Sequence, residues 1–165
     1  MSSTQALKGR IRSVKSTKQI TKAMELVAAS KMRRAQDSTK ASAPYTLAAR
    51  QLLTALSTHT SVKGHPLFVQ RDIKTRLLIV IASDKGLAGA FNSNLVRLYA
   101  RELKKDDNQG IKNTTITVGR KAAQFVARLK DTEVLGSYQN LPDHPNGSEL
   151  HAILDTAKNL FTEGT

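Results

Sequence analysis

The segment with the clearest potential for chemistry is Asp84-Lys85-Gly86-Leu87-Ala88-Gly89, which follows a short apolar run. Glycines between a strand and a helix can let backbone amides bind phosphate at the helix N-terminus. The spacing Gly86-x-x-Gly89 matches neither G-x-G-x-x-G nor G-x-x-x-x-G-K-[ST], so we interpret it first as a tight turn between a strand and a helix. Asp84 follows an expected parallel strand, where α/β enzymes place functional groups, but an Asp at such a position more often caps a turn.

The remaining residues suggest no catalytic centre. Cysteine is absent, which excludes a thiolate nucleophile and a cysteine-based metal site. None of the four histidines has a second histidine four residues further on, and no Ser-His-acid set can be assembled: His59, His65, His144 and His151. We therefore expect no catalytic, cofactor-binding or metal-binding residues and no enzyme. A nucleotide-binding α/β enzyme stays as an alternative, because the glycine turn allows it.

The charge of the chain is concentrated near its N-terminus. The formal net charge is +13, and residues 1–40 hold ten Lys or Arg residues against Glu25 and Asp37. Such an arm indicates an acidic partner, which could be nucleic acid, an anionic membrane or an acidic protein surface. Since the cations flank apolar residues on several sides, we favour a docking element over a merely solvated face. A basic nucleic-acid-binding protein is the second alternative.

The elements that must position these residues begin with a long helix. From Thr4 to Thr58 good helix formers dominate, and Pro44 is expected to kink the helix rather than end it. Two apolar trios occur at spacings of four and three, and the step from Val14 to Ile20 is six positions, so no single straight seam joins them. The trios are Leu7, Ile11 and Val14, then Ile20, Met24 and Val27. Such a helix needs a partner that wraps or encloses it.

The second half of the chain alternates strand and helix patterns. Strands are expected at 76–83, buried on both faces, at 114–118 and at 133–138. Helices are expected at 94–105, around 122–129, and after a capping Ser148, where Leu150, Ile153, Leu154, Ala157 and Phe161 share one face. Strand-helix units in series predict a parallel sheet with right-handed crossovers. The expected fold class is α/β: a long N-terminal helix plus a small Rossmann-like domain.

This pattern predicts three parts: a helix at 1–60, a connection at 61–74 and an α/β domain at 75–165 that is truncated at its C-terminal end. The longest apolar run, Leu77 to Ala82, is too short to span a bilayer, and the N-terminus has no signal-peptide core. We expect a soluble protein that can sit beside a membrane.

Two motifs resemble those of one family. Ile11 to Gln36 reads IRSVKSTKQITKAMELVAASKMRRAQ, which is similar to the N-terminal helix signature of γ subunits of F-type ATP synthases. Ser83 to Asn92 reads SDKGLAGAFN, which resembles the Ser-Asp-Arg-Gly-Leu-Cys-Gly segment of that family. Lys85 stands where the family has Arg, and Ala88 stands where many members have Cys. The order of the two motifs also fits the family.

The resemblance implies a non-catalytic central-stalk rotor that couples proton-driven rotation of a membrane ring to ATP synthesis. Its implied partners are the α and β subunits of the catalytic ring, the ε subunit and the membrane c-ring, with no nucleic acid. Its implied location is peripheral, on the cytoplasmic face of a bacterial membrane. In this family the N-terminal helix forms half of an antiparallel coiled coil with a C-terminal helix, which this sequence lacks. We therefore expect the N-terminal helix either to fray or to pair with a second copy.

The resemblance also supplies candidate contact residues. Contact with the αβ ring is expected for Lys8, Arg10, Ile20, Met24, Val27, Lys31, Arg33, Arg34, Lys85, Gly86, Leu87 and Ala88. Coiled-coil packing is expected for Leu7, Ile11, Val14, Ile20, Met24 and Val27. An acidic loop of the β subunits is the implied partner of the cations. Charge at such a surface contributes orientation and encounter more than affinity.

Overall fold

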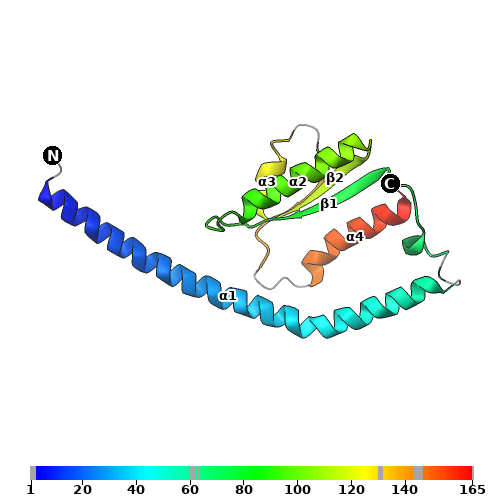
Figure 1. Cartoon of the computed structure of the whole chain (residues 1–165), viewed down its shortest axis with the longest axis horizontal. Helices are drawn as coiled ribbons and strands as arrows, with labels where there is room; N and C mark the ends of the chain where they lie inside the picture. The colour runs from blue at the N-terminus through cyan, green and yellow to red at the C-terminus, as the bar shows by residue number, and fades with distance from the viewer. Residues whose placement is uncertain (1–2, 60–61, 63, 130–131, 143–146, 165) are drawn as a thin grey trace. The chain divides into compact units, whose positions relative to one another are not determined.

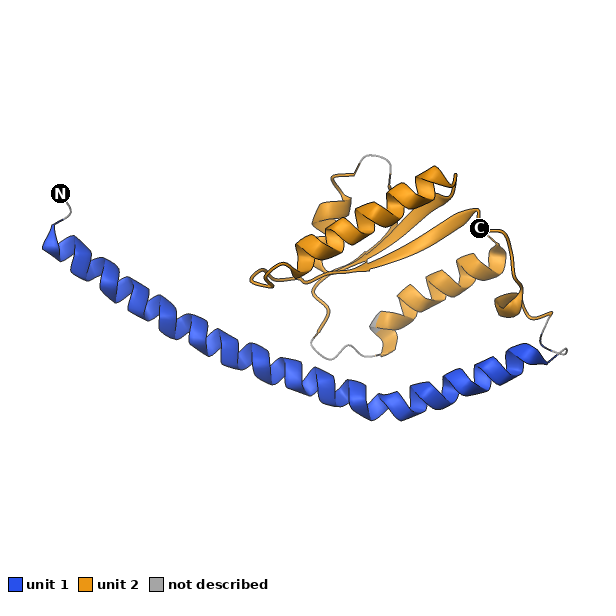
Figure 2. Cartoon of the chain, in the orientation of Figure 1, with its two compact units in different colours: residues 1–62 blue, residues 63–165 orange. Residues whose placement is uncertain are grey.

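The computed structural model describes residues 3–59, 62, 64–129, 132–142 and 147–164. The chain forms two compact units, residues 1–62 and 63–165 (Figure 2). The first unit consists mainly of one helix, and the second holds a parallel sheet with its helices. Each unit is described by itself below.

The first unit is built on helix α1, Thr4–Thr58, which confirms the long helix predicted from composition (Figure 1). The Ser3 hydroxyl oxygen accepts a hydrogen bond from the Gln5 amide and caps its N-terminus. Pro44 lies inside the helix, as expected, and α1 bends in its cyan part. A proline removes one backbone hydrogen bond and pushes its ring against the preceding turn, so a bend follows without a break.

Helix α1 buries no residue that the structure describes. Both predicted apolar trios are therefore exposed; Met24, for example, keeps 48% of its surface accessible. A helix normally gains most of its stability by packing an apolar face against another element. Within the described chain, α1 relies on its own backbone hydrogen bonds and on the high helix propensity of its residues.

The second unit contains a sheet of three described strands: β1 Thr75–Ile81, β2 Lys112–Val118 and β3 Glu133–Tyr138. They are parallel in the order β1-β2-β3, with Ile79 of β1 beside Ile116 of β2. Helices α2 Phe91–Asn108, α3 Arg120–Val126 and α4 Gly147–Glu163 follow the strands in turn. A 3₁₀ turn, η2 Pro66–Phe68, precedes β1. The predicted α/β class with a parallel sheet is confirmed.

Two apolar clusters lie on opposite faces of the sheet. On one face, Val80 of β1 packs with Tyr99 of α2 and Val126 of α3, and the Tyr99 hydroxyl lies 2.7 Å from Thr115 Oγ1 of β2. Ile116 and Val118 point to the other face and pack against Ile153 of α4. Alternate residues of β2 thus serve both clusters, which makes β2 the centre of the domain.

Three sequence predictions about this unit are wrong in detail. Strand β1 is not buried on both faces: it lies at the edge of the sheet, and Ile81 is 61% exposed. On α4, Leu154 is 62% exposed, whereas the neighbouring Ile153 packs in the core. Ser148 lies inside α4, which begins at Gly147. An apolar run indicates a strand, but which faces of that strand are buried depends on the elements that pack against it.

An ion pair ties the start of β1 to the end of α2. The Arg76 guanidinium lies 2.8 Å from a carboxylate oxygen of Asp106, which is fully buried, and 3.5 Å from Glu102. A buried carboxylate is costly unless a cation compensates its charge, so the guanidinium of Arg76 is held beside Asp106.

In the parts of the chain that the structure describes, no helix is both long and apolar enough to cross a membrane.

Candidate partner-binding site

The carboxyl ends of the three strands meet at one edge of the sheet, where Asp84 joins them. Asp84 follows β1, and its Oδ1 accepts hydrogen bonds from the amides of Arg120, at 2.8 Å, and Asn140, at 3.0 Å. Arg120 opens α3 directly after β2, and Asn140 follows β3. We call this arrangement the Asp84 clasp. Asp84 is thus a capping carboxylate, and the groups that it caps are the start of α3 and the segment after β3.

These hydrogen bonds alter the acidity of Asp84. The amide of Asn140, then that of Arg120, holds the pKa of the carboxyl below its ordinary value of 3.8, and the charges of Arg120 and Lys85 act in the same direction. Partial burial opposes them. The clasp is therefore strongest with a charged carboxylate.

Close backbone packing beside the clasp requires a glycine. Gly119 has φ +90°, and a Cβ added there would lie 2.1 Å from the Ala82 carbonyl oxygen. The Gly119 amide donates to the Tyr138 carbonyl at 2.7 Å. The ends of β1, β2 and β3 thus converge without room for a side chain at this position.

A second set of hydrogen bonds holds the loop from the other side. Ser83 Oγ donates to the Lys85 carbonyl at 2.7 Å, and the Asn92 side-chain amide donates to Ser83 Oγ at 2.9 Å. The Lys121 amide donates to the Ser83 carbonyl at 3.0 Å. The base of the loop is thereby fixed to both α2 and α3.

The tip of the loop projects from this base. All four predicted contact residues Lys85 to Ala88 are exposed, and Leu87 is 88% exposed. Leu87 also has φ +63°, a left-handed conformation that L-residues with branched side chains rarely adopt. Gly89, at φ +54°, completes the turn into α2. The structure thus brings together the predicted contact residues of this motif on one presented tip.

The predicted contact residues of α1 do not all share a face. Ile20, Met24, Val27, Lys31 and Arg34 follow one another at spacings of four and three within α1. These spacings place them along one face, which we call the α1 stripe; it changes from apolar to cationic along the helix. Arg33, one residue before Arg34, lies on a different face. Lys8 and Arg10 lie near the N-terminus of α1, beside the first apolar trio.

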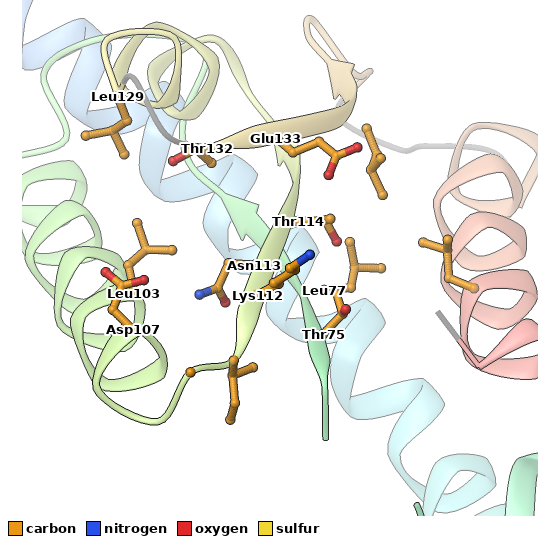
Figure 3. Close-up of a pocket in the computed structure, with 14 residues that line it drawn as sticks. Thr75, Leu77, Leu103, Asp107, Lys112, Asn113, Thr114, Leu129, Thr132 and Glu133 are labelled. Carbon is orange, nitrogen blue, oxygen red and sulfur yellow. The ribbon is translucent and has the colours of Figure 1, made fainter. Parts of the chain in front are cut away.

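A pocket of about 850 Å³ lies at the opposite edge of the sheet, near the starts of β1 and β2 (Figure 3). Leu77, Leu103 and Leu129 contribute apolar lining, and Asp107 and Glu133 contribute carboxylates. Ligands of open α/β sheets bind at the carboxyl ends of the strands, not at this edge. We assign the pocket no role.

The histidines occupy separate structural positions. His59 follows the last residue of α1, His65 accepts a hydrogen bond from the Leu67 amide in η2, and His151 lies on α4. His144 lies outside the described residues. Among the residues that are described, no group of three or more His, Asp or Glu side chains could hold a metal ion.

The similarity to known proteins extends over nearly the whole sequence. Residues 3–165 match the family model described as ATP synthase, and the curated relatives below carry the name ATP synthase gamma chain. The chain belongs to the ATP synthase γ-chain family. This result confirms the resemblance that the two motifs indicated.

Three γ-chain relatives illustrate this similarity. The sequence is 42% identical over 164 residues to the γ chain of Opitutus terrae, 41% identical over 167 residues to that of Synechocystis sp., and 35% identical over 164 residues to that of Ralstonia nicotianae. These alignments cover 99–100% of this chain but 53%, 53% and 56% of the relatives. The chain therefore spans about half the length of the curated relatives that it matches.

Of the site features, sequence reasoning missed the partners of Asp84. Arg120 and Asn140 lie 36 and 56 residues further along the chain, so no local motif joins them to it. A signal was present nonetheless. Both residues lie two positions beyond the end of a predicted strand, and the carboxyl ends of parallel strands meet at one edge.

Proposed function

We infer that this chain serves in the central stalk of an F-type ATP synthase, where it couples proton-driven rotation of a membrane ring to ATP synthesis. The catalysis itself belongs to the surrounding αβ ring, and this chain contributes no catalytic residue. The observation that carries the proposal is α1, a helix of 55 residues without a buried side chain, in a member of the γ-chain family. Its exposed apolar and cationic residues suit a shaft that other subunits enclose.

The proposal assigns a role to each predicted set of residues. The α1 stripe and the Lys85 to Ala88 tip contact the αβ ring, together with Lys8, Arg10 and Arg33. The apolar trios pack in a coiled coil with a second helix, and they are also the surface through which an isolated copy self-associates. The remaining proposed partners are the ε subunit and the c-ring, and the proposed location is the cytoplasmic face of a bacterial membrane, as a peripheral component.

Charge reversal on α1 tests this function. The double change Lys31→Glu and Arg34→Glu alters the cationic end of the α1 stripe, and Arg12→Glu with Lys15→Glu is a control of equal charge on the same helix. Binding to a purified ring of α and β subunits is measured by fluorescence anisotropy at low and high salt.

We expect the stripe variant to bind at least about tenfold more weakly at low salt, with a smaller difference at high salt, because salt screens exposed charges. The control should stay close to the wild-type affinity. Absence of any ring binding by the unaltered chain would refute the proposal. Equal affinities of the two variants would show that the α1 stripe does not contribute to ring binding.

A further inference from the structure

A hollow of about 520 Å³ lies between helices α2 and α3, which pack together on one face of the sheet (Figure 1). Its volume is within the range of sites that bind small molecules. We call it the α2–α3 hollow. Its lining comes from α2, from α3 and from the turn that follows α3: Asn92, Ser93, Val96, Arg97, Lys121, Gln124, Phe125 and Arg128.

The charges that line the α2–α3 hollow all have one sign. Arg97, Lys121 and Arg128 contribute positive charges, and the sequence has no acidic residue at 91–101 or 119–129. Within the described residues, none of these three cations forms an ion pair with a carboxylate. Folding thus gathers three cations from two elements without a compensating acid, and an anion between them would relieve their mutual repulsion.

The apolar wall of the hollow is held in place by the core of the domain. Val96 and Phe125 are half-buried. The Phe125 ring meets the Tyr99 ring edge-on, with centroids 6.4 Å apart, and the Tyr99 hydroxyl lies 2.7 Å from Thr115 Oγ1 of β2. This wall therefore keeps its shape whether or not a ligand is bound.

Hydrogen bonds also position two of the cations. The Arg97 guanidinium donates to the side-chain oxygen of Asn94. The Lys121 amide donates to the Ser83 carbonyl at 3.0 Å, which holds the first turn of α3 to the end of β1. Guanidinium and ammonium groups bind phosphate oxygens through charge-assisted hydrogen bonds, and groups that are already positioned lose little entropy when they do so.

We propose that the α2–α3 hollow binds a diphosphate group, held by Arg97, Lys121 and Arg128. One phosphate carries about −1.5 to −2 charges near pH 7, so two linked phosphates match three cations better than one does. Val96 and Phe125 form a wall for an organic group attached to the diphosphate. The site uses none of the residues proposed to contact the αβ ring, so this inference does not depend on the proposed function.

The test measures binding of pyrophosphate, ADP and inorganic phosphate to the full chain by isothermal titration calorimetry, at low and at high salt. The hollow variant combines Lys121→Ala with Arg128→Ala. The matched control combines Lys104→Ala with Lys105→Ala, which removes two exposed cations of α2 that do not line the hollow. Lys121→Arg with Arg128→Lys retains both charges. Circular dichroism gives the Tm of each variant.

We expect the wild-type chain to bind pyrophosphate at a single saturable site, more tightly than inorganic phosphate and more weakly at high salt. The hollow variant should bind at least about tenfold more weakly with an unchanged Tm, because it loses two charge-assisted contacts on the surface. The control and the charge-retaining variant should each bind within about threefold of the wild-type chain. Tighter binding of ADP than of pyrophosphate would identify an organic diphosphate as the ligand, and equal affinities would assign the site to the diphosphate alone.

Equal losses in the hollow variant and the control would overturn the inference, since they would show attraction to positive charge in general. Absence of saturable binding of both pyrophosphate and ADP would overturn it as well. Ring binding is measured separately, so failure of this site and failure of the proposed function are distinguishable.

Discussion

Helix α1 and the sheet domain are stabilised in different ways. The central strand of the sheet places Ile116, 1% exposed, between packed elements, and buried Thr115 and Thr117 point to the opposite face. In α1 the residues of the same chemical type, such as Ile11 and Ile20, are exposed along the whole helix. The sheet domain owes its fold to non-local packing, whereas α1 owes its conformation to local hydrogen bonds and propensity. Apolar residues in α1 are thus available to partners, and those of the central strand β2 are not.

The largest expected effect compares one isoleucine in each region. Ile116→Ala should cost about 2–5 kcal/mol of the unfolding free energy of the sheet domain, because it leaves a cavity in a packed core. Ile20→Ala should change stability by less than about 0.5 kcal/mol, since it removes only exposed surface and adds a better helix former. Urea unfolding followed by tyrosine fluorescence and circular dichroism measures both. Similar losses for the two variants would break the comparison.

The next effect concerns the bend in α1. Pro44→Ala restores a backbone hydrogen bond and should stabilise the helix around this position by up to about 3 kcal/mol. Hydrogen exchange of the amides at 40–48 should slow, and spin labels at 20 and 56 should report a longer separation as the helix straightens. Pro66→Ala, in η2, is the control and should leave exchange in α1 unchanged. Unaltered exchange in the Pro44 variant would assign the bend to another cause.

A smaller effect is expected at the clasp, which only the sheet domain possesses. Asp84→Ala removes the acceptor of two amides and should cost about 1–2 kcal/mol, as the loss of a helix cap does. Asp84→Asn keeps an acceptor oxygen and should cost less. Exchange at the Arg120 and Asn140 amides should quicken in the alanine variant, while the exposed Asp107→Ala serves as a control. No change at these two amides would show that the clasp contributes nothing to order.

The smallest effect is the pH dependence of the clasp. The pKa of Asp84 is lower in the folded chain than its ordinary value of 3.8, so its contribution to stability is complete above that value. As the pH falls below about 4 through the folded pKa, protonation removes the contribution. Unfolding measured from pH 6 to pH 2 should show a shallower acid loss in Asp84→Asn than in the wild-type chain. Helix α1 should show no matching difference between the two proteins, and identical acid profiles of the sheet domain would contradict the assignment.

The sequence predicts the positions of helices and strands better than it predicts which side chains are buried. Helix Thr4–Thr58 and strand Glu133–Tyr138 were both expected at the positions where the structure has them, because propensity and breakers act over a few residues. The exposure of Ile81 and Leu154 could not be predicted, since it depends on where α4 lies against the sheet. The contact residues remain predictions. The structure shows that residues Lys85 to Ala88 are exposed, and a binding measurement must decide whether they contact a partner.

The two glycines near the tip should differ sharply in tolerance to natural variation. Every missense change of a glycine codon introduces a Cβ, and at Gly119 that atom would lie 2.1 Å from a backbone oxygen. At Gly86, where φ is not positive, the same atom meets open space. Any missense substitution at position 119 should therefore prevent folding, while position 86 should tolerate substitution. In a saturation-mutagenesis screen for folded protein, codon 119 should be depleted of all nineteen substitutions and codon 86 should retain most of them.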